Sequence, residues 1–171
     1  MNTMQQPRIE KLTLNVGAGK DQSRLDKGVA VLKMITGIDP IKTVTNKRIP
    51  TWGLRPGLPI GCKLTLRKNK AVEVLKRLLD AKNKKLMQTQ FDDAGNISFG
   101  IHEYIDIPGA TYDPKIGVLG LQVCVTLEKP GYRIKRRKIE PKRIPKKHTI
   151  TKEEAITFMQ KNFGITLGEE K

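Results

Sequence analysis

Residues 12–16 read Leu-Thr-Leu-Asn-Val, an alternation in which every second side chain is apolar. The same period of two recurs in Lys-Leu-Thr-Leu-Arg at 63–67 and in Leu-Gln-Val-Cys-Val-Thr-Leu at 121–127. Successive side chains of a strand point to opposite faces of a sheet, so each segment predicts a strand with one buried and one wet face. Residues 96–99 predict a further strand after a turn at residues 92–95.

Three other segments have the spacing of amphipathic helices, with apolar residues recurring at 25–32, 72–79 and 156–163. Asp21 or Ser23 can cap the first helix, Gly37 can end it, and Thr151 with Glu154 forms a capping box before the last. The order of these elements predicts an α+β sandwich in a single domain of residues 1–171. In this fold the helices cover one face of a mainly antiparallel sheet and leave the other face open.

Between Pro40 and Val72 the chain has eight Lys or Arg residues and no Asp or Glu. The whole chain has 33 Lys plus Arg against 17 Asp plus Glu, a formal net charge of +16. Carboxylates near a phosphate chain are repelled, whereas cations release its counterions, so this pattern favours a nucleic-acid partner and above all RNA. A basic but merely solvated surface is the alternative.

The outward positions of the predicted strands combine hydrogen-bonding groups with cations. Aromatic residues are only 5% of the chain, so stacking of single-stranded bases is not expected. We expect contacts with the backbone and grooves of structured RNA instead, or else an ordinary solvated sheet face. The outward residues are Thr13, Asn15, Lys63, Thr65, Arg67, Gln122 and Thr126.

Residues 130–147 contain nine Lys or Arg residues and one acid, Glu140. Pro130, Pro141 and Pro145 oppose regular structure here. The segment predicts a basic extension at about residues 129–150 that is poorly ordered until it meets an anion. A flexible, merely solvated loop is the alternative.

Catalytic and metal-binding patterns are weak. The turn at Gly17–Lys20 follows a strand and precedes a helix, but its spacing departs from both the Walker and the dinucleotide-binding patterns. The two histidines, His102 and His148, have no partner at ligand spacing. The aspartates at 92 and 93 are more simply explained by a tight turn than by magnesium. We therefore predict no cofactor, no metal and no enzyme, and keep as the alternative a small nucleotide-dependent or RNA-modifying enzyme built on the 17–20 turn.

The two cysteines, Cys62 and Cys124, lack partners in sequence and predict free thiols in a reducing compartment. The first residues lack the apolar segment of a signal peptide, and the longest apolar stretch, Ile116–Leu127, is too short to span a bilayer. We expect a soluble, cytoplasmic protein that has no membrane partner.

Five ordered blocks resemble the L5 family of large-subunit ribosomal proteins, and together they extend over nearly the whole chain. The short N-terminus and the insertion near 129–150 resemble the archaeal and eukaryotic branch, with an archaeal size. The blocks are Pro7–Gly19, Ile35–Thr43, Leu54–Arg67, Phe91–Glu103 and Tyr112–Pro114.

This resemblance implies a structural protein that anchors 5S rRNA in the central protuberance and also contacts large-subunit rRNA. It implies that a loop at about residues 50–60 projects to the P-site tRNA. The other implied partners are neighbouring ribosomal proteins of the protuberance and of the small-subunit head, the latter through an inter-subunit bridge. The family often has Gln after the residue matching Gly37, so Ile38 puts any contact of that Gln in question.

The residue predictions combine the charge pattern with this resemblance. The candidate tRNA-binding residues are Trp52, Arg55, Pro56 and Gly57. The candidate rRNA-binding residues are Thr13, Asn15, Lys42, Thr43, Thr45, Asn46, Lys47, Arg48, Lys63, Thr65, Arg67, Arg133, Arg136 and Arg137.

Overall fold

A five-stranded sheet forms the centre of the protein, whose computed structural model describes residues 2–168. Its strands lie in the order β2 (Ile41–Val44), β3 (Pro59–Leu66), β1 (Arg8–Gly17), β6 (Leu121–Glu128) and β5 (Ile97–Ile101). Every neighbouring pair is antiparallel. The short strands β4 (Lys85–Met87) and β7 (Thr166–Gly168) form a separate parallel pair. The predicted α+β class is confirmed. The predicted domain of 1–171 also includes residue 1 and residues 169–171, which lie outside the described residues.

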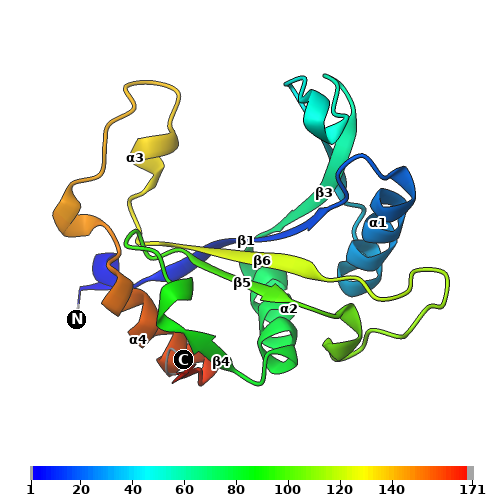
Figure 1. The fold of residues 1–171 in the computed structure, drawn as a ribbon. Coiled ribbons are helices and arrows are strands. Elements are labelled where there is room, and N and C mark those ends of the chain that lie inside the picture. Colours follow the sequence, from blue (N-terminus) through cyan, green and yellow to red (C-terminus); the bar gives the residue numbers. More distant parts are fainter. Residues whose placement is uncertain (1, 169–171) are drawn as a thin grey trace.

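The helices cover one face of the sheet. They are α1 (Gln22–Thr36), α2 (Lys68–Ala81) and α4 (Lys152–Phe163), whereas the single turn α3 (Arg133–Arg136) lies on the opposite side of the sheet (Figure 1). In Figure 1, α2 and α4 lie below the sheet. A Cβ at Gly28 of α1 would lie only 3.0 Å from Val16 Cγ1 and 3.2 Å from Cys62 Sγ, so this glycine lets α1 approach the buried face closely.

The helix ends follow the predicted capping residues. The Asp21 carboxylate accepts the backbone N–H groups of Ser23 and Arg24 at the start of α1. Gly37 ends α1 with a φ of 69°, a left-handed conformation that favours glycine. Thr151 and Glu154 form the capping box of α4. These local signals fix where the helices start and stop.

The strand register separates an apolar face from a polar one. Leu12 and Leu14 of β1 are 0% exposed and belong to the core together with alternate residues of β3, β5 and β6. The intervening residues of the same strands face the other side of the sheet. The prediction of a sheet with one buried and one open face is therefore confirmed.

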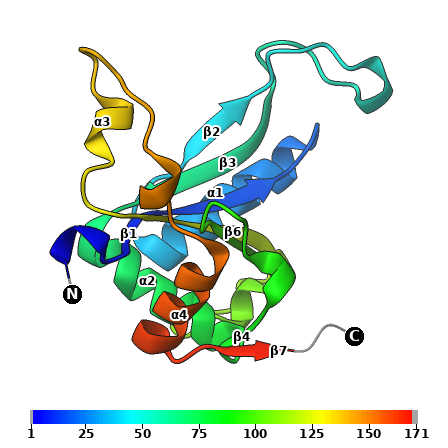
Figure 2. The same cartoon turned by 90° about the vertical axis from the view of Figure 1, so that its left-hand side faces the viewer.

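Two segments rise above the open face at opposite ends of the molecule (Figures 1 and 2). We call residues 45–58, between β2 and β3, the β2–β3 loop, and we call residues 129–150 the basic extension. The loop ends slightly before the predicted bounds of about 50–60, because Pro59 and Ile60 already belong to β3. The loop also contains a 3-10 turn at Pro50–Trp52, where no regular element was expected.

The basic extension is more structured than the prediction of a long irregular loop. It contains α3 and a 3-10 turn at Lys146–His148. The remaining 3-10 turns of the described chain are Thr3–Gln5, Gln88–Gln90 and Tyr104–Asp106.

Candidate nucleic-acid interface

The open face carries rows of polar side chains that run across the strands. One row places Lys63 of β3 opposite Asn15 of β1, which in turn lies opposite Gln122 of β6. Asn15 Nδ2 donates to Gln122 Oε1 at 2.9 Å. The side-chain carbonyl of Asn15 and the side-chain amino group of Gln122 form no hydrogen bond within the described chain, so both are available to a partner.

A second row places Thr65, Thr13, Cys124 and Ser98 side by side across four strands. Neither row contains an acid. The surface therefore offers hydroxyls, amides and a cation without a carboxylate to repel phosphate. This arrangement brings together four of the predicted residues, which are Thr13, Asn15, Lys63 and Thr65.

The two predicted residues of β2 lie on different sides of the sheet. Thr43 lies opposite Gly61, and its Oγ1 is 3.2 Å from the position that a Gly61 Cβ would take, so it faces the open side. Lys42 is the next residue back, and its Nζ forms an ion pair with Asp26 of α1 at 3.1 Å. Lys42 therefore lies on the helical side, away from the open face.

Arg67 lies just past the end of β3, where it is the N-cap residue of α2. Its Nη1 contacts both the carbonyl and the carboxylate of Glu10, at 3.4 and 3.5 Å. This pairing with an acid partly neutralises Arg67, so it is a weaker candidate for a phosphate contact than Lys63.

Thr45 was predicted to contact RNA but is only 8% exposed. Its hydroxyl donates to the Lys47 carbonyl at 3.0 Å and accepts the Lys47 N–H at 3.3 Å. Thr45 therefore shapes the start of the β2–β3 loop. The following residues Asn46, Lys47 and Arg48 are exposed.

The β2–β3 loop presents a large aromatic surface beside a cation. Trp52 is 66% exposed, so it does not pack onto its own domain. Arg55, Pro56 and Gly57 are also exposed. Figure 2 shows the 3-10 turn that contains Trp52 far from the sheet.

One of the predicted RNA-binding cations, Arg136, instead fixes the basic extension to the sheet. Arg136 Nη1 lies 2.5 Å from Glu10 Oε1, and Arg136 Nη2 lies 2.6 Å from Glu128 Oε2. Glu128 is also paired with Arg8. Arg133 and Arg137 are exposed, and the Arg137 side chain donates to the Glu140 carbonyl. Of these three arginines, Arg136 is the structural anchor.

A second anchor lies at the start of the extension. Lys129 is 3% exposed and its ammonium donates to both carboxylate oxygens of Glu154, at 2.9 and 2.7 Å. Burial raises the pKa of Glu154. The hydrogen bonds from Lys129 and from the Thr151 backbone, with the charges of Lys129 and His148, outweigh that effect and lower the pKa below its ordinary value. The pair ties the extension to α4.

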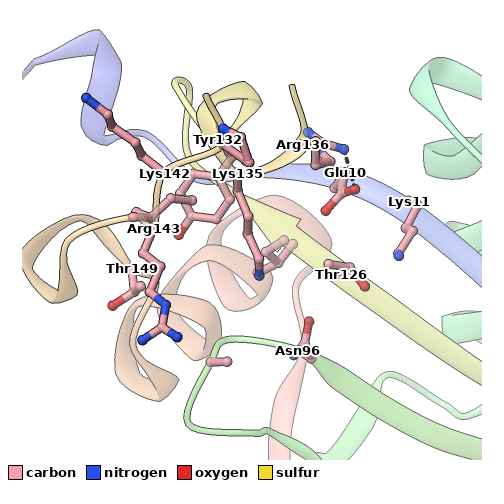
Figure 3. A pocket seen from close by; sticks show the side chains of 14 residues that line it. Glu10, Lys11, Asn96, Thr126, Tyr132, Lys135, Arg136, Lys142, Arg143 and Thr149 are labelled. Carbon is pink, nitrogen blue, oxygen red and sulfur yellow. Dashed lines mark hydrogen bonds and ion pairs between the residues drawn. The ribbon is translucent and has the colours of Figure 1, made fainter. Parts of the chain in front are cut away.

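A cavity of about 760 Å³ lies between the basic extension and the end of the sheet. Figure 3 shows Lys135 and Arg143 extending from the extension, and Lys11 and Thr126 on the sheet below. Burial raises the pKa of the Tyr132 hydroxyl, which stays a neutral donor to the His148 carbonyl.

Sequence reasoning missed several residues of the open face and of this cavity. Lys11 could have been found by extending the alternation backward from Thr13. Ser98 could be placed on the open face only once β5 was known to pair with β6. Lys135 and Arg143 required the path by which the extension folds back on the sheet.

The Gly17–Lys20 turn does not form a phosphate site. The N–H groups of Ala18 and Gly19 both donate to the Ile60 carbonyl, at 2.9 and 3.0 Å. The first N–H groups of α1 are bonded to Asp21, whose negative charge would repel phosphate. The donors that a bound nucleotide would need are already used.

The rest of the described chain offers little other chemistry. Residues 2–168 contain no group of three or more potential ligands that could hold a metal. No described helix has the length and apolar character needed to cross a membrane. Both cysteines are free thiols, Cys62 buried and Cys124 exposed, and burial raises the pKa of the Cys62 thiol while the charge of Lys42 opposes the shift.

Comparison with known proteins gives matches along nearly the whole chain. A family model described as "Ribosomal protein L5" matches residues 2–55, and the model of the C-terminal part of that ribosomal family matches residues 59–166. "Large ribosomal subunit protein uL5" of Sulfolobus acidocaldarius is 46% identical over 168 residues, which cover 98% of this chain and 94% of the relative. The proteins of that name from Methanobrevibacter smithii and Nanoarchaeum equitans are 44% and 47% identical, each over 96% of this chain and 97% of the relative.

Proposed function

Because the chain belongs to the ribosomal protein L5 family, we propose that its open sheet face binds 5S rRNA and anchors it in the large subunit. Membership makes the protein a structural component of the large ribosomal subunit, associated with rRNA and other ribosomal proteins in the cytoplasmic ribosome. It is not an enzyme, so the alternative of an enzyme built on the 17–20 turn is wrong.

The observation that carries the proposal is the pair of acid-free polar rows on the open face, between two basic projections. Lys63 supplies a cation, and Asn15, Thr13 and Thr65 supply hydrogen-bonding groups that suit phosphates and 2′-hydroxyls. The strands hold these groups in a fixed register, so the face can recognise the shape of a folded RNA. We also propose that residues 1–171 act as one RNA-binding domain.

The test uses the purified protein and 5S rRNA. We expect Asn15→Ala and Thr65→Ala each to weaken binding by roughly 0.5–1.5 kcal/mol, the contribution of a neutral hydrogen bond. Thermal unfolding should hardly change, because neither side chain belongs to the core. A large shift in unfolding with unchanged RNA affinity would assign the RNA to the wrong face of the sheet.

A pair of lysines on adjacent strands provides a matched control. Lys63→Ala should flatten the dependence of log affinity on log salt by about 0.7–0.9, the loss of one phosphate contact. Lys42→Ala removes the same charge on the helical side and should change the slope less. Equal changes would indicate diffuse electrostatic attraction instead of binding to the open face.

We propose that the β2–β3 loop contacts the P-site tRNA. The exposed Trp52 offers a flat surface and Arg55 a planar cation, a combination suited to sugar-phosphate and unpaired bases. Deleting residues 51–58 should leave 5S rRNA binding intact and weaken retention of peptidyl-tRNA by assembled ribosomes. Loss of 5S rRNA binding, with the fold preserved, would assign the loop to the wrong RNA.

We propose protein partners as well, in the central protuberance and in the small-subunit head, the latter through an inter-subunit bridge. Support comes from large apolar side chains exposed outside the RNA face. Tyr112 and Val118, between β5 and β6, are 57% and 66% exposed. Such side chains suit contacts with neighbouring proteins better than contacts with phosphate.

A further inference from the structure

The cavity under the basic extension is roomy and strongly basic. Its volume of about 760 Å³ lies within the range of pockets that hold small organic ligands. Five cations line it, against the single acid Glu10. The cations are Lys11, Lys135, Arg136 and Arg143, together with Lys142, whose ammonium group points away from the cavity in Figure 3.

The acid at this cavity is already neutralised. Glu10 is paired with both Arg136 and Arg67. Lys11, Lys135 and Arg143, in contrast, form no ion pair with any acid among residues 2–168. Their charges therefore remain available for an anion that enters the cavity.

The floor of the cavity continues the open face. Lys11 lies opposite Thr126 in the sheet, and both share the face of Thr13 and Cys124. Thr126 brings a hydroxyl to the cavity and Asn96 an amide. Asn96 Nδ2 donates to the Asp92 carboxylate, so the side-chain carbonyl of Asn96 remains available as an acceptor. Leu127 and Ile144 add apolar surface.

We propose that this cavity receives one unstacked nucleotide of the bound rRNA. Its phosphate binds Lys135 and Arg143, its base lies against the apolar wall, and Asn96 and Thr126 bond to a base edge or to the 2′-hydroxyl. An acidic peptide would match the charge, but the floor is the face that we propose for rRNA. The inference rests on the proposed rRNA-binding role and adds a specific subsite to it.

The test is an NMR titration of the isotope-labelled whole protein with AMP, GMP, CMP and UMP in turn. Inorganic phosphate and a hexaglutamate peptide are the comparison probes. We expect at least one nucleotide to shift the amides of Asn96, Thr126 and Lys135 in a saturable way, and more tightly than either comparison probe. Equal affinity for phosphate alone, tighter binding of the peptide, or no saturable shift would each overturn the subsite.

Single substitutions distinguish binding in the cavity from general electrostatic attraction. Lys135→Gln and Arg143→Gln should each weaken nucleotide binding about tenfold, as expected for a charged hydrogen bond. Lys142→Gln is the matched control, since Figure 3 shows this side chain pointing away, and its effect should stay within about twofold. Thr126→Leu keeps the charge but fills space at the floor of the cavity, and it should abolish nucleotide binding. An effect of Lys142→Gln as large as that of Lys135→Gln would overturn the inference.

The Asn15→Ala variant separates this inference from the proposed function. Asn15 lies outside the cavity, so Asn15→Ala should weaken 5S rRNA binding and leave mononucleotide binding unchanged. If Asn15→Ala weakens 5S rRNA binding while no nucleotide enters the cavity, the proposed subsite is wrong but the proposed 5S rRNA-binding function stands.

Discussion

The two projections rise from the same side of the sheet but are held in different ways. In the β2–β3 loop, Thr45 N–H donates to the Leu58 carbonyl at 3.0 Å and Gly57 N–H donates to the Thr45 carbonyl at 2.9 Å. Leu54 is buried there although it does not belong to the main core. The basic extension instead relies on ion pairs of Arg136 and Lys129.

This difference shows that two basic segments can use their charge differently. The loop is fixed by backbone hydrogen bonds and one apolar side chain, so Lys47, Arg48 and Arg55 remain available to a partner. The extension uses Lys129 and Arg136 for the fold and leaves Lys135 and Arg143 for binding. A count of cations along the chain cannot separate these two roles.

Removing the anchor of the extension should have the largest effect. Arg136→Ala leaves the nearly buried Glu128 carboxylate with Arg8 as its sole ion-pair partner in the described chain. Since Arg136 is itself half-exposed, we expect a loss of about 2 kcal/mol in the free energy of unfolding, measured by urea titration. The extension should also become easier to cleave with trypsin.

The matched control is Arg133→Ala on the same helical turn. Arg133 has no ion pair with an acid in the described chain, so its loss should change stability by less than about 0.5 kcal/mol. If both variants behave alike, the extension is held by its backbone, and the contrast with the loop disappears.

The Lys129–Glu154 pair should contribute less, because Glu154 is 44% exposed. Glu154→Gln keeps the capping box but removes the charge beside a buried ammonium, and we expect a loss of about 1 kcal/mol. Glu153→Gln, one residue earlier on the exposed surface, is the control and should be nearly neutral.

The effect of Glu154 should depend on pH in a definite direction. Its pKa is lowered in the folded protein from an ordinary value of 4.5. The stabilisation is therefore fully present above about pH 4.5 and is lost as the pH falls through the lower pKa of the folded state. In acid, urea titrations of the original protein and of the Glu154→Gln variant should therefore give the same free energy of unfolding. A gap that widens as the pH falls would contradict this role of Glu154.

The predictions that held depend on local patterns. The alternation in β1, β3 and β6 placed Thr13, Asn15, Lys63 and Thr65 outward, because a period of two needs no knowledge of the tertiary structure. The caps Asp21 and Thr151 were predicted for the same reason. The family resemblance rested on ordered blocks and was confirmed by the family models.

Most of the structural roles that the sequence did not indicate depend on contacts distant in sequence. Arg136 and Glu10 are separated by 126 positions, so nothing near Arg136 indicates that it is an anchor. In β2 both Ile41 and Val44 are exposed, and a strand of four residues is too short for its pattern to show which side Lys42 occupies. Thr45 is a different case, because its hydroxyl closes a local turn with the Lys47 carbonyl, a contact that the charge pattern does not indicate.

The smallest effect on stability should come from the tip of the β2–β3 loop. Trp52→Ala removes a side chain that is 66% exposed, so the free energy of unfolding should change by less than about 0.5 kcal/mol. Leu54→Ala, two residues later, removes a side chain that is 6% exposed and should cost about 2 kcal/mol in local stability, measured by hydrogen exchange of the loop amides. If the loop is fixed by Leu54 and its backbone, high salt should leave the exchange of its amides unchanged, because no ion pair among residues 2–168 holds it. Faster exchange of the loop amides in Trp52→Ala than in Leu54→Ala would mean that the tryptophan supports the loop, and Trp52 would then no longer be free for a tRNA.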